Sequence, residues 1–571
     1  MVQQHMVVGI VGLGSTGQAL LHALDASGTR VIGVDSDPAV VERARTRSGT
    51  ADVSGRFERL RAADVIIEAV SEHAGVKEDV LRRSGAECPG VTALVTTTAS
   101  LSVPSLAIAS GRPAHLVGLR FALPLSPRAG AELVRTTMTA PEAVRAAGEL
   151  LSLLGPAVAP PGVDTPVARR LLLPYLGRAA ALHEEGYASS EDIDNAMRLG
   201  CALPAGPLEM LDAVGVDTVH RELGDLHRRT GRGYHRPPSS LERMIASGRL
   251  GRKSGQGYHA YDGTGRRVVA EPQDRPSGQA PAIGHVGIVG TGTMARGIAH
   301  TLALAGVENT MVGRTDERAD SAREAIGSSL RRAVERGRLD SGAAHTALAR
   351  IQGDHDLTAL SDCDLVIEAV AEDVSVKRSV FEQLDKVCRP GAVFATSTSS
   401  LSVADCAAAT SRPEAVIGMH FFNPAQVMRL VEVVRTGATS DAAHATAHAL
   451  CERLGKTAVD CADRTGFIVN FLLFPYLNHA VRALELDGSL GVEEVDTAVE
   501  SLLGFPLGPF GLLDTVGLDV SLAILQRLHE AFGTEDFEPA RSLNGLVGMG
   551  HLGRKTGTGF RSRGPLGRRT A

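Results

Sequence analysis

Apolar positions along the chain follow two different periods. In the first part of each half, short runs rich in β-branched residues alternate with helical stretches. In the second half these runs are VGIVG, DLVIEAV, AVFAT and AVIGMHF. They predict a parallel sheet wrapped by helices. From about Thr465 apolar residues recur at helical spacing, as in FIVNFLLFPYLNHAVRALE, which predicts an all-helical domain.

Segments of the first half return in the second half. GIVGLGSTG at 9–17 returns as GIVGTGTMA 278 residues later, whereas VIIEAVSE at 65–72 returns as LVIEAVAE 300 residues later. Nearly all of the length difference therefore falls in one insertion of 22 residues early in the second copy. The repeat indicates a gene duplication. The expected fold class is α/β, with two tandem modules, each a Rossmann-type doubly wound sheet followed by an all-helical domain.

The repeat and the change of period together define the expected domains. The segment between the copies is rich in Pro, Gly and charge, which is typical of a linker, and the end of the chain is basic and Gly-rich. We expect a degenerate Rossmann domain at 1–160, a helical domain at 161–261, a linker at 262–284, a second Rossmann domain at 285–462, a second helical domain at 463–562 and a tail at 563–571.

Composition limits the class of protein. At 571 residues the chain is too long for one hydrophobic core, and its 43% hydrophobic and 22% charged residues are ordinary for a soluble protein. A net charge of -6 gives no reason to expect a nucleic-acid or membrane partner, and no apolar run approaches the roughly 18 residues of a membrane span. The seven cysteines show no Cys-x-x-Cys spacing, so we expect reduced thiols in a cytoplasmic protein and no metal site.

Each copy carries a glycine-rich loop between a predicted strand and a predicted helix. Glycines in G-x-G-x-x-G permit a tight turn and let backbone amides approach a pyrophosphate at a helix N-terminus. The motif predicts nicotinamide dinucleotide binding in both copies. Its expected cofactor-binding residues are Gly12, Gly14 and Gly17 in the first copy, and Gly290, Gly292, Thr293 and Met294 in the second copy, where Ala295 takes the place of the third glycine.

The end of the second strand distinguishes the two cofactors. In the first copy VIGVD ends in Asp35, whose carboxylate can bind a ribose 2′-hydroxyl and favours NAD. The second copy has Gly313 at that position, followed by Arg314, which can pair with a 2′-phosphate. We therefore expect NADP to be favoured over NAD in the second copy. The alternative is that Arg314 stacks on adenine and NAD is used.

The second copy contains, in order, EAVAEDVSVK, TSTSSLSV, GMHFFNPAQVMRLVEVV, RTGFIVN and GFPLGPFGLLDTVGLD. In these motifs it resembles the 3-hydroxyacyl-CoA dehydrogenase family from Gly287 to Phe560. HFFNP followed by LVE is highly specific to that family. The resemblance implies a Rossmann domain with a helical domain and the oxidation of a 3-hydroxyacyl thioester by a nicotinamide cofactor.

The resemblance also implies a set of catalytic residues. His420 would act as the base for the hydroxyl proton, because an imidazole titrates near neutrality. Glu432 would fix its tautomer and stabilise the imidazolium, and Ser399 would hydrogen-bond the reacting oxygen. Asn423 and Asn470 resemble the residues that hold the catalytic pair and the substrate. Two further residues, Glu372 and Lys377, match positions near the nicotinamide ribose.

The 22-residue insertion resembles the family's helical arm over the acyl-CoA. In SAREAIGSSLRRAVERGRLD, Ser329 and Arg336 align with the Ser and Lys that contact CoA, and a basic group there suits CoA phosphates. The alternative is an ordinary amphipathic helix with a solvated Arg face.

The first copy lacks the catalytic set. Glu132 is retained as the counterpart of Glu432, but Ser399, His420, Asn423 and Asn470 are replaced by Ala99, Arg120, Leu123 and Arg169. Arg cannot serve as the base because it stays protonated. We expect this copy to be catalytically dead and to serve as a built-in partner, giving an intramolecular pseudo-dimer, or a homodimer of the whole chain.

The sequence thus predicts an enzyme, a 3-hydroxyacyl-CoA dehydrogenase of fatty acid metabolism acting on an acyl-CoA thioester with NADP or NAD. The acyl group stays open between short chains such as 3-hydroxybutyryl and a 3-hydroxyadipyl group. The alternatives are an acyl-carrier-protein thioester as substrate, or a non-catalytic dinucleotide-binding sensor that keeps the fold.

Overall fold

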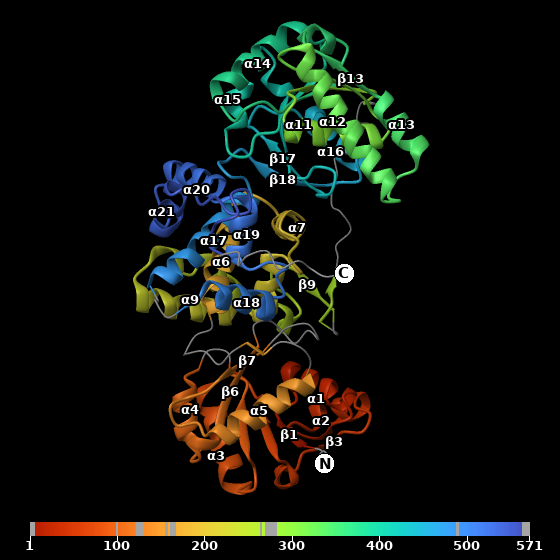
Figure 1. Cartoon of the computed structure of the whole chain (residues 1–571). Coiled ribbons are helices and arrows are strands. Elements are labelled where there is room, and N and C mark those ends of the chain that lie inside the picture. The colour runs from red at the N-terminus through yellow and green to blue at the C-terminus, as the bar shows by residue number, and fades with distance from the viewer. Residues whose placement is uncertain are drawn as a thin grey trace.

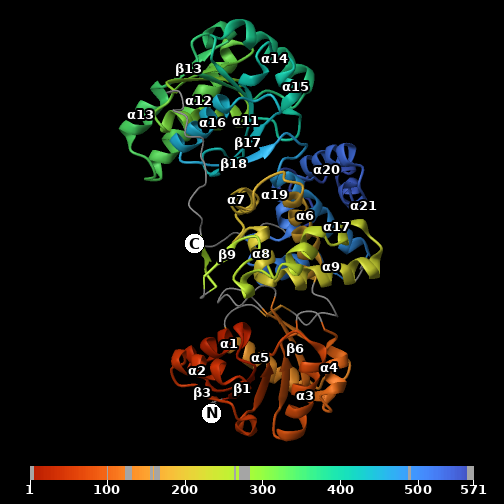
Figure 2. The same ribbon diagram turned by 180° about the vertical axis from the view of Figure 1, so that it is seen from behind.

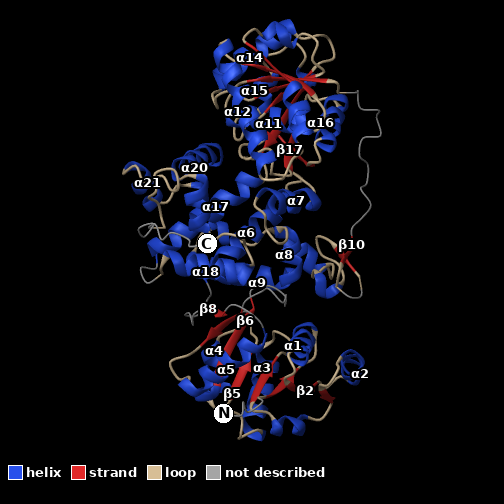
Figure 3. Ribbon diagram, turned by 45° about the vertical axis from the view of Figure 1, so that its right-hand side comes forward, coloured by secondary structure: helices blue, strands red, loops and turns tan. Residues whose placement is uncertain are grey.

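The structure is a computed structural model that describes residues 6–98, 101–121, 131–154, 158–159, 167–262, 265–268, 283–486 and 490–561. Two sheet domains lie at the ends of the molecule and helical domains lie between them (Figures 1 and 2). When the elements are coloured by type, strands gather at the two ends and helices fill the middle (Figure 3). The expected α/β class with two Rossmann-plus-helical modules is confirmed.

Each half begins with an eight-stranded sheet, and the two sheets share one strand order. The orders are β3-β2-β1-β4-β5-β6-β7-β8 and β13-β12-β11-β14-β15-β16-β17-β18. The first sheet consists of β1 (Val7–Val11), β2 (Arg30–Val34), β3 (Asp52–Ser54), β4 (Val65–Glu68), β5 (Ala93–Thr96), β6 (Leu116–Phe121), β7 (Ala131–Val134) and β8 (Val158–Ala159). The second consists of β11 (His285–Val289), β12 (Glu308–Val312), β13 (Ile351–Asp354), β14 (Leu365–Glu368), β15 (Val393–Thr396), β16 (Val416–Phe421), β17 (Leu430–Arg435) and β18 (Thr457–Ala462).

The sequence predicted parallel sheets, but each sheet contains an antiparallel pair of strands. β7 runs antiparallel to β6, and β17 runs antiparallel to β16. The reason is the connection, because β16 and β17 are joined by a short loop with no crossover helix, and a parallel pair needs such a crossover. The reversal places His420 directly opposite Glu432 in the strand register, with Arg120 opposite Glu132 in the first sheet.

Helices cover both sheets, and the strands between them are apolar on both faces. The neighbouring residues Ile66 and Ile67 of β4, and Val366 and Ile367 of β14, point to opposite faces and are all buried. The first-half helices are α1 (Ser15–Ala26), α2 (Pro38–Arg47), α3 (Ala74–Glu87), α4 (Val103–Ala109) and α5 (Pro141–Leu154). The second-half helices are α11 (Thr293–Leu304), α12 (Asp316–Glu335), α13 (Ser341–Ala349), α14 (Val374–Val387), α15 (Val403–Ala407) and α16 (Asp441–Arg453).

The 22-residue insertion forms a helical hairpin. The first half has one short helix, α2, after β2, whereas the second half has the longer α12 packed against α13. Side-chain caps fix where both helices begin: Thr315 accepts a hydrogen bond from the Arg318 amide, and Asp340 accepts one from the Ala343 amide. The inserted segment, expected to form a helical arm, is thus a pair of packed helices, and its contact with an acyl-CoA stays a prediction.

The helical domains follow the sheets. The first contains α6 (Val167–Glu184), α7 (Ser190–Gly200), α8 (Pro207–Val214), α9 (Val216–Thr230) and α10 (Ser239–Ala246). The second contains α17 (Val469–Leu486), α18 (Val492–Leu503), α19 (Pro509–Val516), α20 (Leu518–Phe532) and α21 (Arg541–Gly548). The segment expected to be a linker from Asp262 contains a short strand, because β10 (Arg267–Val268) pairs with β9 (Ala260–Tyr261); residues 269–282 lie outside the described residues.

The two helical domains share one hydrophobic core. α6 packs along α17, and buried side chains such as Leu176 and Leu477 belong to the same apolar cluster. The rings of Tyr175 and Tyr476 lie 5.7 Å apart, and an ion pair joins Arg178 to Asp536. Burial on this scale removes apolar surface that either domain alone would expose to water.

A helix of each half also packs against the sheet of the other half. Helix α7 of the first half packs on β17 and β18, and α18 of the second half packs on β7 and β8. The Tyr187 hydroxyl donates a hydrogen bond of 2.7 Å to the Ala462 carbonyl, and Arg464 pairs with Glu185 at 2.6 Å. The first half therefore supports the sheet of the second half directly.

None of the described helices is long and apolar enough by itself to cross a membrane; the bent pair α19 and α20 meets the length and composition test only when taken together.

The shared core predicts that the second half depends on the first. Residues 284–571 expressed alone should self-associate or aggregate, because the apolar face of α17 would lose its cover. Analytical ultracentrifugation and thermal unfolding, with the full chain as the control, would measure this. Co-expression of residues 1–262 should restore a soluble complex. A stable, fully active monomer of residues 284–571 would contradict the dependence.

Candidate active site

A histidine and a glutamate form a buried pair where β16 and β17 lie side by side. His420 Nδ1 lies 2.7 Å from Glu432 Oε2, and the two side chains are 6% and 0% exposed. The other glutamate oxygen accepts hydrogen bonds from the amides of Ile468 and Val469, at 3.0 and 2.9 Å. These amides belong to the start of α17, where unsatisfied N–H groups favour a carboxylate. The pair can hold one imidazole tautomer and leave Nε2 for a substrate proton.

Ser399, Asn470 and Glu372 are joined by hydrogen bonds. The side-chain amide of Asn470 donates a hydrogen bond of 3.2 Å to the backbone carbonyl of Ser399. The backbone amide of Ser399 donates one of 2.9 Å to Glu372 Oε1. Burial raises the pKa of Glu372, but the Lys377 ammonium and the hydrogen bond from Thr398 outweigh burial and hold that pKa below its usual value. Glu372 is therefore an ionised acceptor that fixes the turn carrying Ser399.

Lys377 pairs with two carboxylates. Its ammonium is 1% exposed, lies 2.8 Å from both oxygens of Glu368 and lies 3.5 Å from Glu372, the other residue expected near the nicotinamide ribose. The first copy has the same buried pair, Lys77 with Glu68 at 2.8 Å. The pair therefore occurs in both copies, and in the second copy Lys377 also helps to hold the Glu372 carboxylate; its contact with the nicotinamide ribose stays a prediction.

Arg527 is a site residue that sequence reasoning missed. It lies on α20, and its guanidinium donates to the Ser400 hydroxyl at 2.5 Å and lies 3.9 Å from Glu372. Its counterpart in the repeat is Asp225, so the comparison of the two copies carried a signal that was not used. Asn423 lies exposed in the loop after β16, and in the described part of the chain it forms no hydrogen bond with His420 or Glu432.

A cleft of about 850 Å³ opens at the glycine-rich loop of the second copy. It is lined by the loop, the start of α11 and the ends of β12 and β14, including Gly290, Gly292, Thr293 and Met294. Gly290 has φ +127°, and a Cβ there would lie 2.5 Å from the Ala369 carbonyl oxygen. A Cβ at Gly292 would meet nothing within 4 Å. The loop therefore needs glycine for its turn and leaves backbone amides open to a pyrophosphate.

Two arginines line this cleft. Arg314 and Arg318 do so together with Asp356 and with His355, whose hydrogen bond to Asp316 raises its pKa. Gly313 stands where the first copy has Asp35, whose carboxylate accepts hydrogen bonds from the amides of Leu13 and Asp37. A Cβ at Gly313 would lie 3.1 Å from backbone atoms of Thr315 and Ala319, which is a tight fit.

A second, smaller cavity of about 250 Å³ lies between α11 and the helical arm. Ser329 lines it, together with Arg296, His300, Arg332 and Gln426. Arg336 does not line this cavity. It is the residue that follows the last turn of α12, and its side chain is exposed. Arg296 and Arg332 are the basic groups that the fold brings to Ser329, and the sequence analysis did not name them.

The first copy uses the corresponding positions differently. Arg169, the counterpart of Asn470, forms a buried pair with Glu222, in which two guanidinium nitrogens lie 2.7 and 2.8 Å from the two carboxylate oxygens. Arg120 stands opposite Glu132 in the strand register. Ala99 and Leu123 lie outside the described residues. At position 169 an ion pair within the helical domain has thus replaced the contact that Asn470 makes to a sheet loop.

Removing one partner of this pair should be costly. Arg169→Ala leaves the Glu222 charge buried without its partner and should lower the free energy of unfolding by about 3–5 kcal/mol. Replacing both residues, as Arg169→Met with Glu222→Leu, should cost much less, because no charge is then stranded. Urea unfolding of the full chain measures both. Equal losses for the single and double variants would contradict this role.

Comparisons with known proteins agree with this geometry. The sequence model described as "3-hydroxyacyl-CoA dehydrogenase, NAD binding domain" matches residues 49–159 and 285–464, and the model described as "3-hydroxyacyl-CoA dehydrogenase, C-terminal domain" matches residues 167–261 and 466–563.

Relatives match over about half of the chain. A 3-hydroxybutyryl-CoA dehydrogenase of Mycobacterium tuberculosis is 44% identical over 281 residues, which is 49% of this chain and 98% of that protein. A probable 3-hydroxybutyryl-CoA dehydrogenase of Bacillus subtilis is 38% identical and covers 48% and 95%. The mitochondrial hydroxyacyl-coenzyme A dehydrogenase of Rattus norvegicus is 38% identical and covers 49% and 90%. The chain is an oxidoreductase with a nicotinamide cofactor, and it belongs to the 3-hydroxyacyl-CoA dehydrogenase family as a tandem duplicate.

Proposed function

We propose that the 3-hydroxyacyl-CoA dehydrogenase reaction takes place in the second half alone, and that the first half is a catalytically dead partner. The observation that carries this proposal is the His420–Glu432 pair together with the Ser399–Asn470 contact. The first half has Arg120 and Arg169 in the places of His420 and Asn470, and Arg169 is bonded to Glu222 instead.

In the proposed mechanism His420 Nε2 takes the proton of the substrate hydroxyl and returns it in the reverse direction. Glu432 holds Nδ1–H in place and stabilises the imidazolium that forms. Ser399 donates a hydrogen bond to the reacting oxygen, and Asn470 fixes the Ser399 turn from α17. When bound, the nicotinamide exchanges a hydride with the carbinol carbon. The site lies between the sheet and the helical domain, where little water reaches the His420–Glu432 pair.

The dinucleotide fits the cleft at the glycine-rich loop, because Gly290 makes the tight turn and the space that a side chain would fill at Gly292 is open. Gly290, Gly292, Thr293 and Met294 would hold the pyrophosphate at the start of α11. For the second half we propose NADP over NAD. Gly313 places no carboxylate beside the ribose, and Arg314 and Arg318 line the cleft next to it.

For the thioester we propose an acyl-CoA held along the helical arm. Ser329, Arg296 and Arg332 meet at the cavity between α11 and α12, and two guanidinium groups suit the phosphates of CoA. Arg336 would add charge at the exposed end of α12. Because two of the relatives are named 3-hydroxybutyryl-CoA dehydrogenases, a short 3-oxoacyl-CoA is the substrate to assay first.

The first half, in this proposal, replaces a second subunit. Its α6 covers α17, and its α7 supports β17 and β18 behind the catalytic pair. All seven cysteines are free thiols, so we also propose a reducing location such as the cytoplasm.

The placement of the active site predicts an asymmetric response to mutation. His420→Ala should lower kcat by about 10² to 10⁴ by removing the general base, while cofactor binding persists. Arg120→Ala, the matched control at the same position of the first half, should leave kcat unchanged. Nicotinamide absorbance with acetoacetyl-CoA measures turnover, and fluorescence of the reduced cofactor measures binding. A large loss in Arg120→Ala would contradict the assignment of the dead half.

The cofactor proposal predicts that Arg314 discriminates between NADPH and NADH. Arg314→Ser should lower kcat/KM for NADPH by about tenfold to a hundredfold, the value of one charge-assisted contact, and should hardly alter kcat/KM for NADH. Arg314→Lys should keep much of the preference because it retains the charge. Gly313→Asp with Arg314→Ser should then favour NADH. Unchanged cofactor ratios in both serine-containing variants would refute the NADP proposal.

A further inference from the structure

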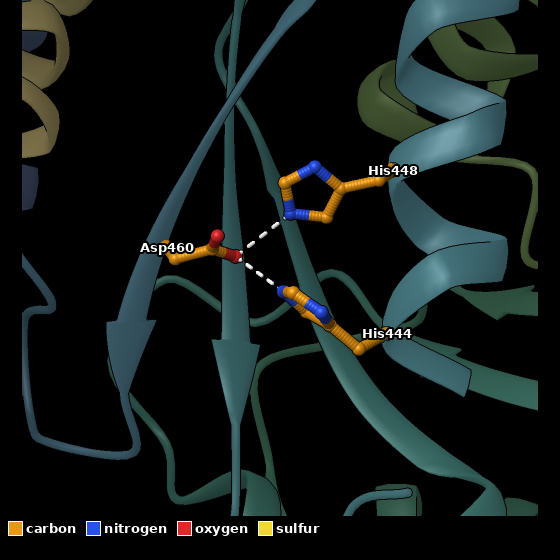
Figure 4. A group of neighbouring side chains, drawn as sticks. All are labelled: His444, His448 and Asp460. Carbon is orange, nitrogen blue, oxygen red and sulfur yellow. Dashed lines mark hydrogen bonds and ion pairs between the residues drawn. The ribbon is translucent and has the colours of Figure 1, made fainter. Parts of the chain in front are cut away.

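Two histidines and an aspartate converge on the face of the second sheet that α16 covers. His444 and His448 are four residues apart on α16, so one turn of the helix places both imidazoles on the same side. Asp460 projects toward them from β18 (Figure 4). The sequence analysis expected no metal site from the cysteine spacing and did not consider His444 and His448, whose third partner lies 12 positions further on.

The three side chains meet at a single carboxylate oxygen. Nε2 of His444 lies 2.7 Å from Asp460 Oδ1, and Nε2 of His448 lies 2.8 Å from the same atom. One atom from each residue, two nitrogens and one oxygen, all lie within 4.8 Å of one another. A tetrahedral zinc ion takes such nitrogen and oxygen ligands at about 2.0 to 2.2 Å, so small side-chain adjustments would admit it among these atoms.

The charges around the group favour a cation. Asp460 Oδ1 accepts a hydrogen bond from each of the two imidazoles, so this carboxylate is the acidic centre of the group. In the hydrogen-bonded arrangement each imidazole presents a proton to the shared oxygen. A divalent ion can replace these protons and pair with the carboxylate.

The exposure of the group suits an accessible site with an open position. The side chains of His444, His448 and Asp460 are 9%, 23% and 41% exposed, so the histidines are anchored while the aspartate faces solvent. Three protein ligands leave a fourth tetrahedral position for water. Two imidazoles with one carboxylate suit zinc and similar transition metals, whereas magnesium and calcium prefer oxygen ligands.

We propose that His444, His448 and Asp460 bind one divalent transition-metal ion of the zinc type. The ion would tie α16 to β18, the strand beside β17, in which Val459 is the register partner of Glu432. Helix α7 of the first half packs on the same strand. The site thus belongs to the junction of the two halves and takes no part in hydride transfer. The first copy has Val144, Gly148 and Pro160 at the aligned positions, so one ion per chain is expected.

Zinc titration of the full, untagged chain tests the proposal. After treatment with a chelator and desalting, the protein should take up one equivalent of zinc with a micromolar or tighter dissociation constant, measured by competition with a chromogenic chelator. Cobalt(II) should give the intense visible absorption of a four-coordinate site. His448→Asn and Asp460→Asn should each lose this equivalent and the cobalt spectrum. His22→Asn, which removes an exposed histidine of α1, should retain both.

Folding and binding can be separated in the same samples. Circular dichroism of the variants shows whether they are folded, and zinc should raise the melting temperature of the wild type and of His22→Asn but not of folded His448→Asn. Absence of zinc uptake by the wild type would show a hydrogen-bonded His–Asp–His group only and would overturn the proposal. Uptake that persists in both His448→Asn and Asp460→Asn would overturn it as well, because the ion would then lie elsewhere.

Discussion

The Glu432 carboxylate connects the two parts of the second module. One of its oxygens bonds His420 across the strand pair, and the other accepts the amides of Ile468 and Val469 at the start of α17. A buried carboxylate is stable only when its oxygens are satisfied, so the sheet and the helical domain must dock in one orientation for this group to be accommodated. That orientation also brings Asn470 to Ser399 and Arg527 to Ser400. The proposed base, its orienting acid and the substrate turn are thus positioned together.

The same docking depends on the other half of the chain. α17 carries Asn470 on one side and packs against α6 through the shared apolar core. α7 lies against β17 and β18. Tyr187 donates a hydrogen bond to the last residue of β18, Ala462, and Glu185 pairs with Arg464 in the segment that follows. The first half retains the parts of the fold that make these contacts. Arg169 of α6, however, forms an ion pair with Glu222 inside the first helical domain.

The sequence was most informative where the chemistry is local or repeated. The glycine loop, the insertion and the two-module organisation follow from motifs and from an internal repeat, and the structure has all three. Residues brought together over long distances were harder to predict. Arg527 contacts Ser400 across 127 positions; the repeat marks Arg527 as different between the two copies, but it does not show that Arg527 contacts Ser400. The motif named Lys377, but its ion pair with Glu368 inside the fold appears only in the structure. The reversal of β17 was missed because apolar runs do not reveal strand direction.

α7 packs on the sheet of the second half and α18 packs on the sheet of the first half, and this arrangement has a consequence for symmetry. In a pair of identical subunits every substitution occurs twice, so a residue that suits one side of the contact must also suit the other. On one chain the two sides are encoded separately, and the covalent connection keeps them at a high effective concentration however dilute the protein is. Each side is then free to change alone. Arg169 and Asn470, at matching positions of α6 and α17, illustrate a division of labour that no homodimer can encode.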